Sequence, residues 1–251
     1  MNTPFISVII PAYNEEKRLE PSLGVITDYL ASQPYEVELL VVDDGSTDRT
    51  REIVEEFAKK SPMSLRLEKN PRNMGKGAAV QRGMLAGEGE YLLFTDADLS
   101  TPIQSMESFL PHLQSGADVV IGTRRHPSAK IERAQPWLRR TLGKGFIVLA
   151  NLMVGIKVSD LNCGFKCFSR KAAREIFSRS RVIGWAFDAE ILYLADRLGY
   201  RIVETPVTWA HSSGSQVRLR KDILSSFRGL LEIRRNSRQG LYNLPQKGGA
   251  N

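Results

Sequence analysis

The sequence predicts an α/β fold with a mostly parallel, Rossmann-like sheet and helices on both of its faces. Short apolar runs alternate with segments in which apolar residues recur every three or four positions, as strands and helices alternate in such folds. The apolar runs are continuous, which is expected of strands that are covered on both faces. Three of these runs lead into acidic residues at the carboxyl end, where sheets of this kind bind their ligands.

The expected elements follow one another closely along the chain. Apolar runs predict strands at residues 5–10, 37–42, 65–67, 91–94 and 118–122. The spacing of apolar residues predicts helices at residues 19–30, 53–57, 75–87, 101–113, 187–198 and 219–231. The fourth of these helices is expected to begin with Thr101 as its N-cap and Pro102 as its first residue. The last is bordered by Lys and Arg residues, which predicts a basic, amphipathic C-terminal region.

The composition is that of an ordinary globular protein, and the length suits one large α/β domain as well as two small ones. Of 251 residues, 42% are hydrophobic and 25% are charged. We expect one domain at residues 1–238 and a flexible tail at residues 239–251. The first residues have no signal-peptide pattern, and no apolar run approaches the ~20 residues that span a bilayer. We therefore expect a cytoplasmic protein whose two cysteines, Cys163 and Cys167, are reduced.

The net charge of +7 is distributed unevenly. Between Arg124 and Lys144 the sequence has seven Lys or Arg residues and one acid, and the segment after Arg201 is also basic. Such asymmetry indicates an anionic partner. Nucleic acid is disfavoured, because aromatic residues are not interleaved with the basic runs as a base-stacking surface would require.

A pair of carboxylates, Asp96 and Asp98, follows the expected strand at residues 91–94. Carboxylates at this end of a parallel strand face the ligand crevice of an α/β sheet. Hard divalent cations take oxygen ligands and keep positions open for phosphate oxygens. The pair therefore predicts a site for Mg²⁺ or Mn²⁺, and the alternative is a helix cap beside a solvated acid.

Several segments together resemble the family 2 inverting glycosyltransferases, which have a GT-A fold. In the first half of the chain they are VIIPAYNE at 8–15, VVDDGSTD at 41–48, NMGKG at 73–77 and TDAD at 95–98. In the second half, residues 122–124, 160–168, 185–193 and 207–209 resemble the polyprenyl-phosphate sugar transferases, the dolichyl-phosphate β-glucosyltransferases among them. The resemblance covers about residues 6–224. It implies transfer of a hexose from a nucleotide sugar to a dolichyl or polyprenyl phosphate.

The resemblance also implies a role for individual residues. The expected nucleotide-binding residues are Pro11, Tyr13, Glu15, Asp44, Lys76 and Asp96. The expected metal ligands are Asp96 and Asp98, and the expected catalytic residues are Asp98, Arg124 and Arg139. On the acceptor side the resemblance places Arg140, Lys144, Trp209 and Ser215. The sequence departs from the pattern at His211, where an acid is frequent, and at Gln216, where Lys is frequent.

The basic segment after Gly122 agrees with a phosphate acceptor. Loss of a nucleoside diphosphate is assisted by a divalent ion and by basic groups that stabilise the developing negative charge. A phosphate acceptor is already ionised, so that no general base is needed, whereas a sugar hydroxyl usually needs a carboxylate to remove its proton. The planar guanidinium of arginine can bind two phosphate oxygens at once.

Other functions remain open at this point. UDP-glucose is the expected donor, and the alternatives are a GDP-mannose-dependent polyprenyl-phosphate mannosyltransferase or a family 2 enzyme with another acceptor. A sugar nucleotidyltransferase is disfavoured because the first turn, residues 11–15, is acidic and contains no glycine. Asp160, Asp188 and Glu190 could contact the sugar or serve as structural partners.

The C-terminal helix also suggests contact with a membrane. Its apolar stripe consists of Leu219, Ile223, Phe227, Leu230 and Leu231, with Lys and Arg residues around it. An apolar stripe bordered by basic residues is typical of a helix that lies on an anionic bilayer. We therefore expect peripheral attachment to the cytoplasmic face of a membrane. The alternative is an amphipathic helix that closes the core.

Overall fold

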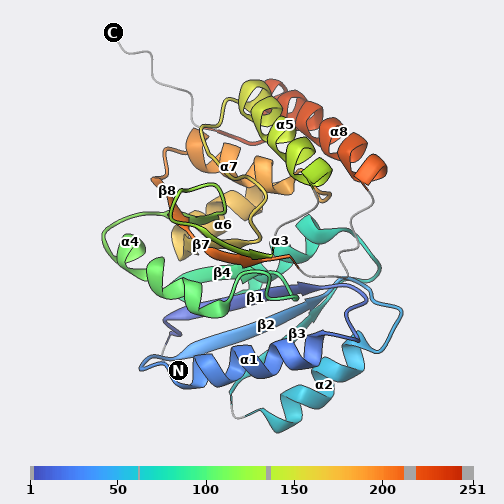
Figure 1. The fold of residues 1–251 in the computed structure, drawn as a ribbon, viewed down its shortest axis with the longest axis vertical. Coiled ribbons are helices and arrows are strands. Elements are labelled where there is room, and N and C mark those ends of the chain that lie inside the picture. Colours follow the sequence, from blue (N-terminus) through green and yellow to red (C-terminus); the bar gives the residue numbers. More distant parts are fainter. Residues whose placement is uncertain (1–2, 62, 134–136, 212–218, 245–251) are drawn as a thin grey trace.

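The computed structural model describes residues 3–61, 63–133, 137–211 and 219–244, and the side chains of residues 137–140, 142–144 and 219–224 lie outside this description. A seven-stranded sheet in the order β3-β2-β1-β4-β7-β5-β8 forms the centre. Figure 1 shows α1 and α2 on one side of this sheet and α5, α7 and α8 on the other. The expected α/β architecture with helices on both faces is confirmed.

The strands are short and mostly parallel. The central sheet contains β1 (Ile6–Ala12), β2 (Val37–Asp43), β3 (Leu65–Lys69), β4 (Tyr91–Thr95), β5 (Val119–Thr123), β7 (Phe165–Ser169) and β8 (Ile202–Pro206). All five expected strands are among them. β7 alone is antiparallel to its neighbours within this sheet. A second, two-stranded sheet pairs β6 (Lys130–Arg133) with β9 (Thr208–Ala210) in parallel.

The helices fill the connections between the strands. They are α1 (Leu19–Ala31), α2 (Thr50–Lys60), α3 (Lys76–Ala86), α4 (Leu110–Gln114), α5 (Trp137–Val154), α6 (Arg170–Arg179), α7 (Phe187–Arg197) and α8 (Leu219–Arg238), with a 3₁₀ helix, η1, at Ile103–Ser108. Figure 1 shows α5 and α8 lying side by side at one end of the molecule.

Each central strand contributes to two hydrophobic cores because its side chains alternate between the faces. On β1, Val8 and Ile10 pack with α1 on one face, whereas Ile9 packs with α3 on the other. The small residues of α3 allow it to approach the sheet closely. A Cβ atom on Gly83 would lie 2.4 Å from a methyl carbon of Ile9 and 2.9 Å from one of Val42. This close packing fixes α3, and with it the loop that precedes α3, against the strands.

The prediction of one continuous helix at residues 101–113 is wrong. The segment forms η1 and then, after Phe109, the short helix α4. Pro102 has a ψ angle of 141°, so it lies outside any helix. Pro111 has no N–H to donate to the carbonyl of Glu107, and a proline ring clashes with the preceding turn of a helix. A continuous α-helix is therefore interrupted here.

The first residues of the expected tail include one that is packed onto the domain. Tyr242 is only 1% exposed, and its hydroxyl donates a hydrogen bond of 2.7 Å to Glu190 Oε1 on α7. The chain immediately after α8 is therefore packed onto the domain. Residues 245–251 of the expected tail lie outside the described part of the chain. Within the described part, no helix has the length and apolar character needed to cross a bilayer.

Candidate functional site

The carboxyl ends of β1, β2, β4 and β5 lie along one edge of the sheet. β7 runs in the opposite direction, so its amino end lies at this same edge, where Phe165 pairs with Thr95. The pairing of Ala12 with Asp43 places the turns after β1 and β2 next to each other. Polar residues from five segments therefore meet at one edge, which is where α/β sheets bind ligands.

Asp96 lies at the centre of this edge, directly after β4. Its side chain is 35% exposed and accepts a hydrogen bond and ion pair from the Lys76 ammonium through Oδ1. On its other side it packs against the backbone of Gly164, where a Cβ atom would lie 2.0 Å from Asp96 Oδ2. Gly164 is therefore required to make room for this carboxylate. No local pattern in the sequence distinguishes Gly164 from the other glycines.

Asp98 is two residues further on and belongs to the same turn. Its Oδ1 accepts a hydrogen bond of 3.0 Å from the backbone N–H of Ser100, and its Oδ2 lies 3.8 Å from Nη1 of Arg18. Leu99, which lies between Asp98 and Ser100, has a φ angle of 49°, a strained conformation for a residue with a bulky side chain. Such strain is concentrated at binding sites, and here it shapes the turn that carries both acids.

These two acids fit a divalent cation. Both are carboxylates on one turn, and Asp96 is accessible to a ligand. No group of three or more His, Cys, Asp or Glu side chains that could hold a metal occurs among the described residues. Two protein carboxylates leave the other coordination positions to water and to phosphate oxygens, which is how Mg²⁺ is usually held beside a nucleotide.

The turn after β1 is tied to the turn after β2. Asn14, with a φ angle of 53°, accepts a hydrogen bond of 2.9 Å from the N–H of Thr47 through its Oδ1. The N–H of Glu15 donates to Thr50 Oγ1 over 2.7 Å. Pro11 lies in β1, and Tyr13 and Glu15 follow it, so the three expected nucleotide residues share this turn.

Glu15 has a partner that the sequence did not indicate. Arg18 donates from Nε and Nη2 to the two oxygens of Glu15, with a distance of 2.8 Å for the second bond. The pKa of Arg18 is raised, because its hydrogen bond and ion pair with Glu15 outweigh the effect of burial. Arg18 therefore connects Glu15 to Asp98, and it was missed because α1 begins directly after it and a lone arginine there resembles a surface residue.

Asp44 is buried and supports the loop before α3. It accepts hydrogen bonds from Asn70 Nδ2 (2.7 Å), the N–H of Met74 (3.0 Å) and the N–H of Gly75 (2.8 Å). Its contact with a nucleotide base stays a prediction. The structure gives Asp44 a further task, which is to hold the loop that carries Lys76.

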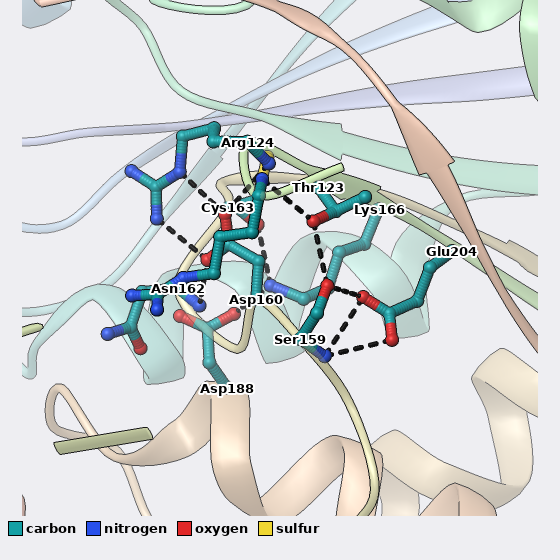
Figure 2. A network of polar contacts seen from close by, with 10 residues as sticks. Thr123, Arg124, Ser159, Asp160, Asn162, Cys163, Lys166, Asp188 and Glu204 are labelled. Carbon is teal, nitrogen blue, oxygen red and sulfur yellow. Dashed lines mark hydrogen bonds and ion pairs between the residues drawn. The ribbon is translucent and has the colours of Figure 1, made fainter. Parts of the chain in front are cut away.

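Arg124, at the end of β5, is fixed by Asp160 (Figure 2). Its Nε and Nη2 donate to the two oxygens of Asp160 over 2.7 and 2.8 Å, and its backbone N–H also donates to this carboxylate. Burial alone would raise the pKa of Asp160, but the guanidinium outweighs it and the pKa is lowered. Asp160 is thus a structural partner that orients Arg124, and among the described residues Nη1 keeps its donors for a further anion.

Two lysines and two aspartates lie next to one another below the strand ends. Lys166 on β7 is fully buried. Its ammonium donates hydrogen bonds of 2.5 Å to Asp188 Oδ1 and 2.6 Å to the carbonyl oxygen of Cys163. Figure 2 shows Asp188 rising from α7 towards Lys166. Burial raises the pKa of Asp188 although Lys166 and Lys76 both oppose this shift. Asp188 is therefore close enough to Lys76 and Asp96 for their charges to influence its pKa.

Glu190, by contrast, is a structural residue. It is fully buried, its Oε2 accepts from the N–H groups of Arg181 and Val182 over 2.9 Å, and its Oε1 accepts from Tyr242. Burial raises the pKa of this carboxyl group. Because its oxygens are engaged and it is fully buried, contact with a sugar is excluded for Glu190.

The acceptor-side residues are only partly described. Arg139, Arg140 and Lys144 lie on α5, but their side chains are outside the described part of the chain, as is Ser215. Trp209 on β9 is 8% exposed, and its ring lies 5.3 Å from the Arg124 guanidinium carbon. Trp209 therefore packs beneath Arg124 and helps to fix it.

Both α5 and α8, which lie side by side at one end of the molecule, carry exposed apolar residues, and α8 also carries exposed arginines. On α5, Leu152 is 79% exposed, with Val148 and Leu149 beside it along the helix. On α8 the expected stripe is divided, because Leu230 is fully buried, whereas Phe227 and Leu231 are exposed. Leu231 lines a groove together with Arg234, Arg235, Arg238 and Gln239. We call these exposed residues the α5–α8 face.

Solved structures share this architecture. Glucosyl-3-phosphoglycerate synthase from Mycobacterium tuberculosis, in complex with UDP, matches 98% of this chain and 82% of its own, with a TM-score of 0.65 and 23% identity. S. aureus TarS 1-349 in complex with UDP-GlcNAc matches 91% of this chain and 66% of its own, with a TM-score of 0.59 and 19% identity. The fold is thus the GT-A fold.

Sequence relatives define the family. The family model described as Glycosyl transferase family 2 matches residues 7–177. A dolichyl-phosphate beta-glucosyltransferase of Trichomonas vaginalis is 37% identical over 97% of this chain and 74% of its own length. The enzyme of that name from Dictyostelium discoideum is 36% identical over 91% of this chain and 76% of its own length. The one from Homo sapiens is 32% identical over 97% of this chain and 79% of its own length. The chain belongs to glycosyltransferase family 2 and is a glycosyltransferase.

Proposed function

We propose that this glycosyltransferase moves glucose from UDP-glucose to dolichyl phosphate or a related polyprenyl phosphate, with inversion and with the help of Mg²⁺ or Mn²⁺. The observation that carries the proposal is the arrangement of charge at the strand ends. Asp96 and Asp98 provide oxygen ligands for a cation, and Arg124, which Asp160 fixes, lies within electrostatic reach of Asp96. A cation site and an anion site therefore share one edge of the sheet.

The donor would occupy the edge between the turns after β1 and β4. Pro11, Tyr13 and Glu15 would flank the base and the ribose, and Asp44 supports this region from the β2 side. Asp96 and Asp98 would hold the cation, which when bound neutralises the diphosphate as it leaves. Lys76 adds a positive charge on the same side, so a diphosphate finds donors from two directions.

The acceptor would approach from the side of Arg124. A phosphate monoester is ionised, so its oxygen can attack the anomeric carbon directly without a general base. Arg124 is oriented through Nε and Nη2 and presents its remaining donors to a phosphate oxygen, and we propose that Arg139, Arg140 and Lys144 on α5 assist it. The relatives named dolichyl-phosphate beta-glucosyltransferase support both this acceptor and glucose as the sugar.

A lipid acceptor requires the domain to approach a membrane. We propose that the α5–α8 face lies on the cytoplasmic surface of an anionic bilayer. Leu152, Phe227 and Leu231 would enter the boundary between head groups and acyl chains, and the arginines of α8 would pair with lipid phosphates. α5 carries the basic acceptor-side residues as well as Leu152, so this orientation would bring the lipid phosphate towards Arg124.

The test is a transfer assay with two donors. Purified protein is incubated with dolichyl phosphate in detergent, with Mn²⁺ or with a chelator, and with radiolabelled UDP-glucose or GDP-mannose. We expect a labelled lipid from UDP-glucose that requires the metal and is lost in Arg124→Gln. Labelling from GDP-mannose alone would establish the mannosyltransferase instead, and metal-dependent hydrolysis without lipid labelling would indicate another acceptor.

A further inference from the structure

Each acid of the proposed cation site already has a basic neighbour. The Lys76 ammonium is bound to Oδ1 of Asp96, and Nη1 of Arg18 lies 3.8 Å from Oδ2 of Asp98. The contact at Asp96 is a direct hydrogen-bonded ion pair, whereas that at Asp98 is longer. A divalent cation at Asp96 would have to share one carboxylate with the Lys76 ammonium. Two positive charges bound to the same carboxylate repel each other strongly.

The backbone around Lys76 is held on both sides. Asp44 accepts from the N–H groups of Met74 and Gly75, and the N–H of Gly77 donates 3.0 Å to the carbonyl of Ile183. Gly75 has a φ angle of 103°, which favours glycine. Lys76 itself begins α3, and its side chain is 23% exposed. The attachment point is therefore fixed, while the ammonium can exchange one anion for another.

A second acid lies within electrostatic reach of the Lys76 ammonium. This is Asp188, which is held in place by the buried Lys166. The four side chains Asp96, Lys76, Asp188 and Lys166 therefore alternate in sign. If the Lys76 ammonium leaves Asp96, the negative charge of Asp188 continues to favour the charged form of Lys76. A donor diphosphate would supply the new hydrogen-bond acceptors.

We propose that the Lys76 ammonium occupies the cation position of the free chain, and that the donor diphosphate draws it away so that donor and metal bind cooperatively. The proposal rests on the proposed function, because it needs a diphosphate donor and a divalent cation. By reciprocity, the factor by which UDP raises the affinity for metal equals the factor by which metal raises the affinity for UDP.

The test measures metal binding without turnover. Free Mn²⁺ is followed by electron paramagnetic resonance during titration of the wild type, Lys76→Met and Lys76→Gln, with and without UDP. Lys69→Met is the matched control, because Lys69 pairs with Glu55 on the protein surface, over 2.8 Å, and removing it deletes the same charge elsewhere. Circular dichroism and melting temperature verify that each variant is folded, and two substitutions guard against a change specific to one side chain.

We expect Lys76→Met and Lys76→Gln to bind Mn²⁺ alone about tenfold more tightly than the wild type, within the usual range of coupling between sites. UDP should strengthen Mn²⁺ binding in the wild type and in Lys69→Met, and much less in the two Lys76 variants. Unchanged or weaker Mn²⁺ binding by both Lys76 variants, with normal coupling to UDP, would overturn the inference and leave the proposed function intact. Absence of UDP-dependent Mn²⁺ binding in the wild type would overturn both.

Discussion

Replacing Gly164 by alanine is a sensitive test of where the Asp96 carboxylate lies. The new Cβ atom would be 2.0 Å from Asp96 Oδ2 and 2.4 Å from its Cγ, whereas ordinary contacts begin at 3.4 Å. The carboxylate must therefore move by more than an ångström. The backbone of Gly164 does not have a positive φ angle, so alanine itself is tolerated there. The perturbation is thus directed at Asp96 and not at the fold.

The expected loss follows from that displacement. Misplacing a catalytic group by about 1 Å can lower the rate about 100-fold, which corresponds to about 2.7 kcal/mol of transition-state stabilisation. Gly164→Ala should therefore lower kcat/KM for glucosyl transfer by about this factor and weaken Mn²⁺-dependent UDP binding, with little change in melting temperature. Gly184→Ala is the matched control, since its Cβ atom would meet nothing within 4 Å. Full activity of Gly164→Ala would refute the described placement of Asp96.

Three further outcomes follow from the packing and charge. Asp160→Asn should reduce the acid sensitivity of the fold. The lowered pKa of Asp160 contributes stability above pH ~4, and this stability is lost as the pH falls through that pKa. The urea midpoint of the variant should therefore change less than that of the wild type below pH ~4. Tyr242→Phe should lower the free energy of unfolding in urea by about 1 to 3 kcal/mol, because Glu190 Oε1 loses its hydrogen-bond donor; an unchanged midpoint would contradict the role of this bond. Leu152→Glu should abolish sedimentation of the protein with anionic vesicles without lowering the melting temperature. Val25 is half exposed on α1, so the control variant Val25→Glu should still sediment with the vesicles.

Most of the fold was predictable because the apolar runs that form its strands can be recognised without knowledge of their tertiary partners. β1, β2 and β4 were expected at nearly their observed bounds. β7 was not assigned as a strand, since its antiparallel insertion between β4 and β5 depends on pairing with residues far away in the sequence. The broken helix at η1 and α4 could have been foreseen from Pro111.

The sequence predicted which types of residue lie at the strand ends of the candidate site. It did not predict which of these residues form ion pairs with one another. The acids after β1, β2 and β4 meet at one edge, as the parallel arrangement requires. The pairing of Arg124 with Asp160 spans 36 residues, and no local pattern signals it. Lys76 was expected at the nucleotide, and its ion pair with Asp96 emerges only when α3 is packed against β4. Local patterns identify donors and acceptors, whereas tertiary packing decides which of them pair.

The most direct test of the central claim is calorimetry of UDP-glucose binding with and without Mn²⁺, in the wild type and in Asp98→Asn. The claim is that carboxylates after β4 hold a cation that in turn holds the donor. It predicts that Mn²⁺ raises the affinity of the wild type for UDP-glucose at least about tenfold, the factor that corresponds to 1.4 kcal/mol, and has no such effect on Asp98→Asn. An equal gain from Mn²⁺ in both proteins would contradict the claim.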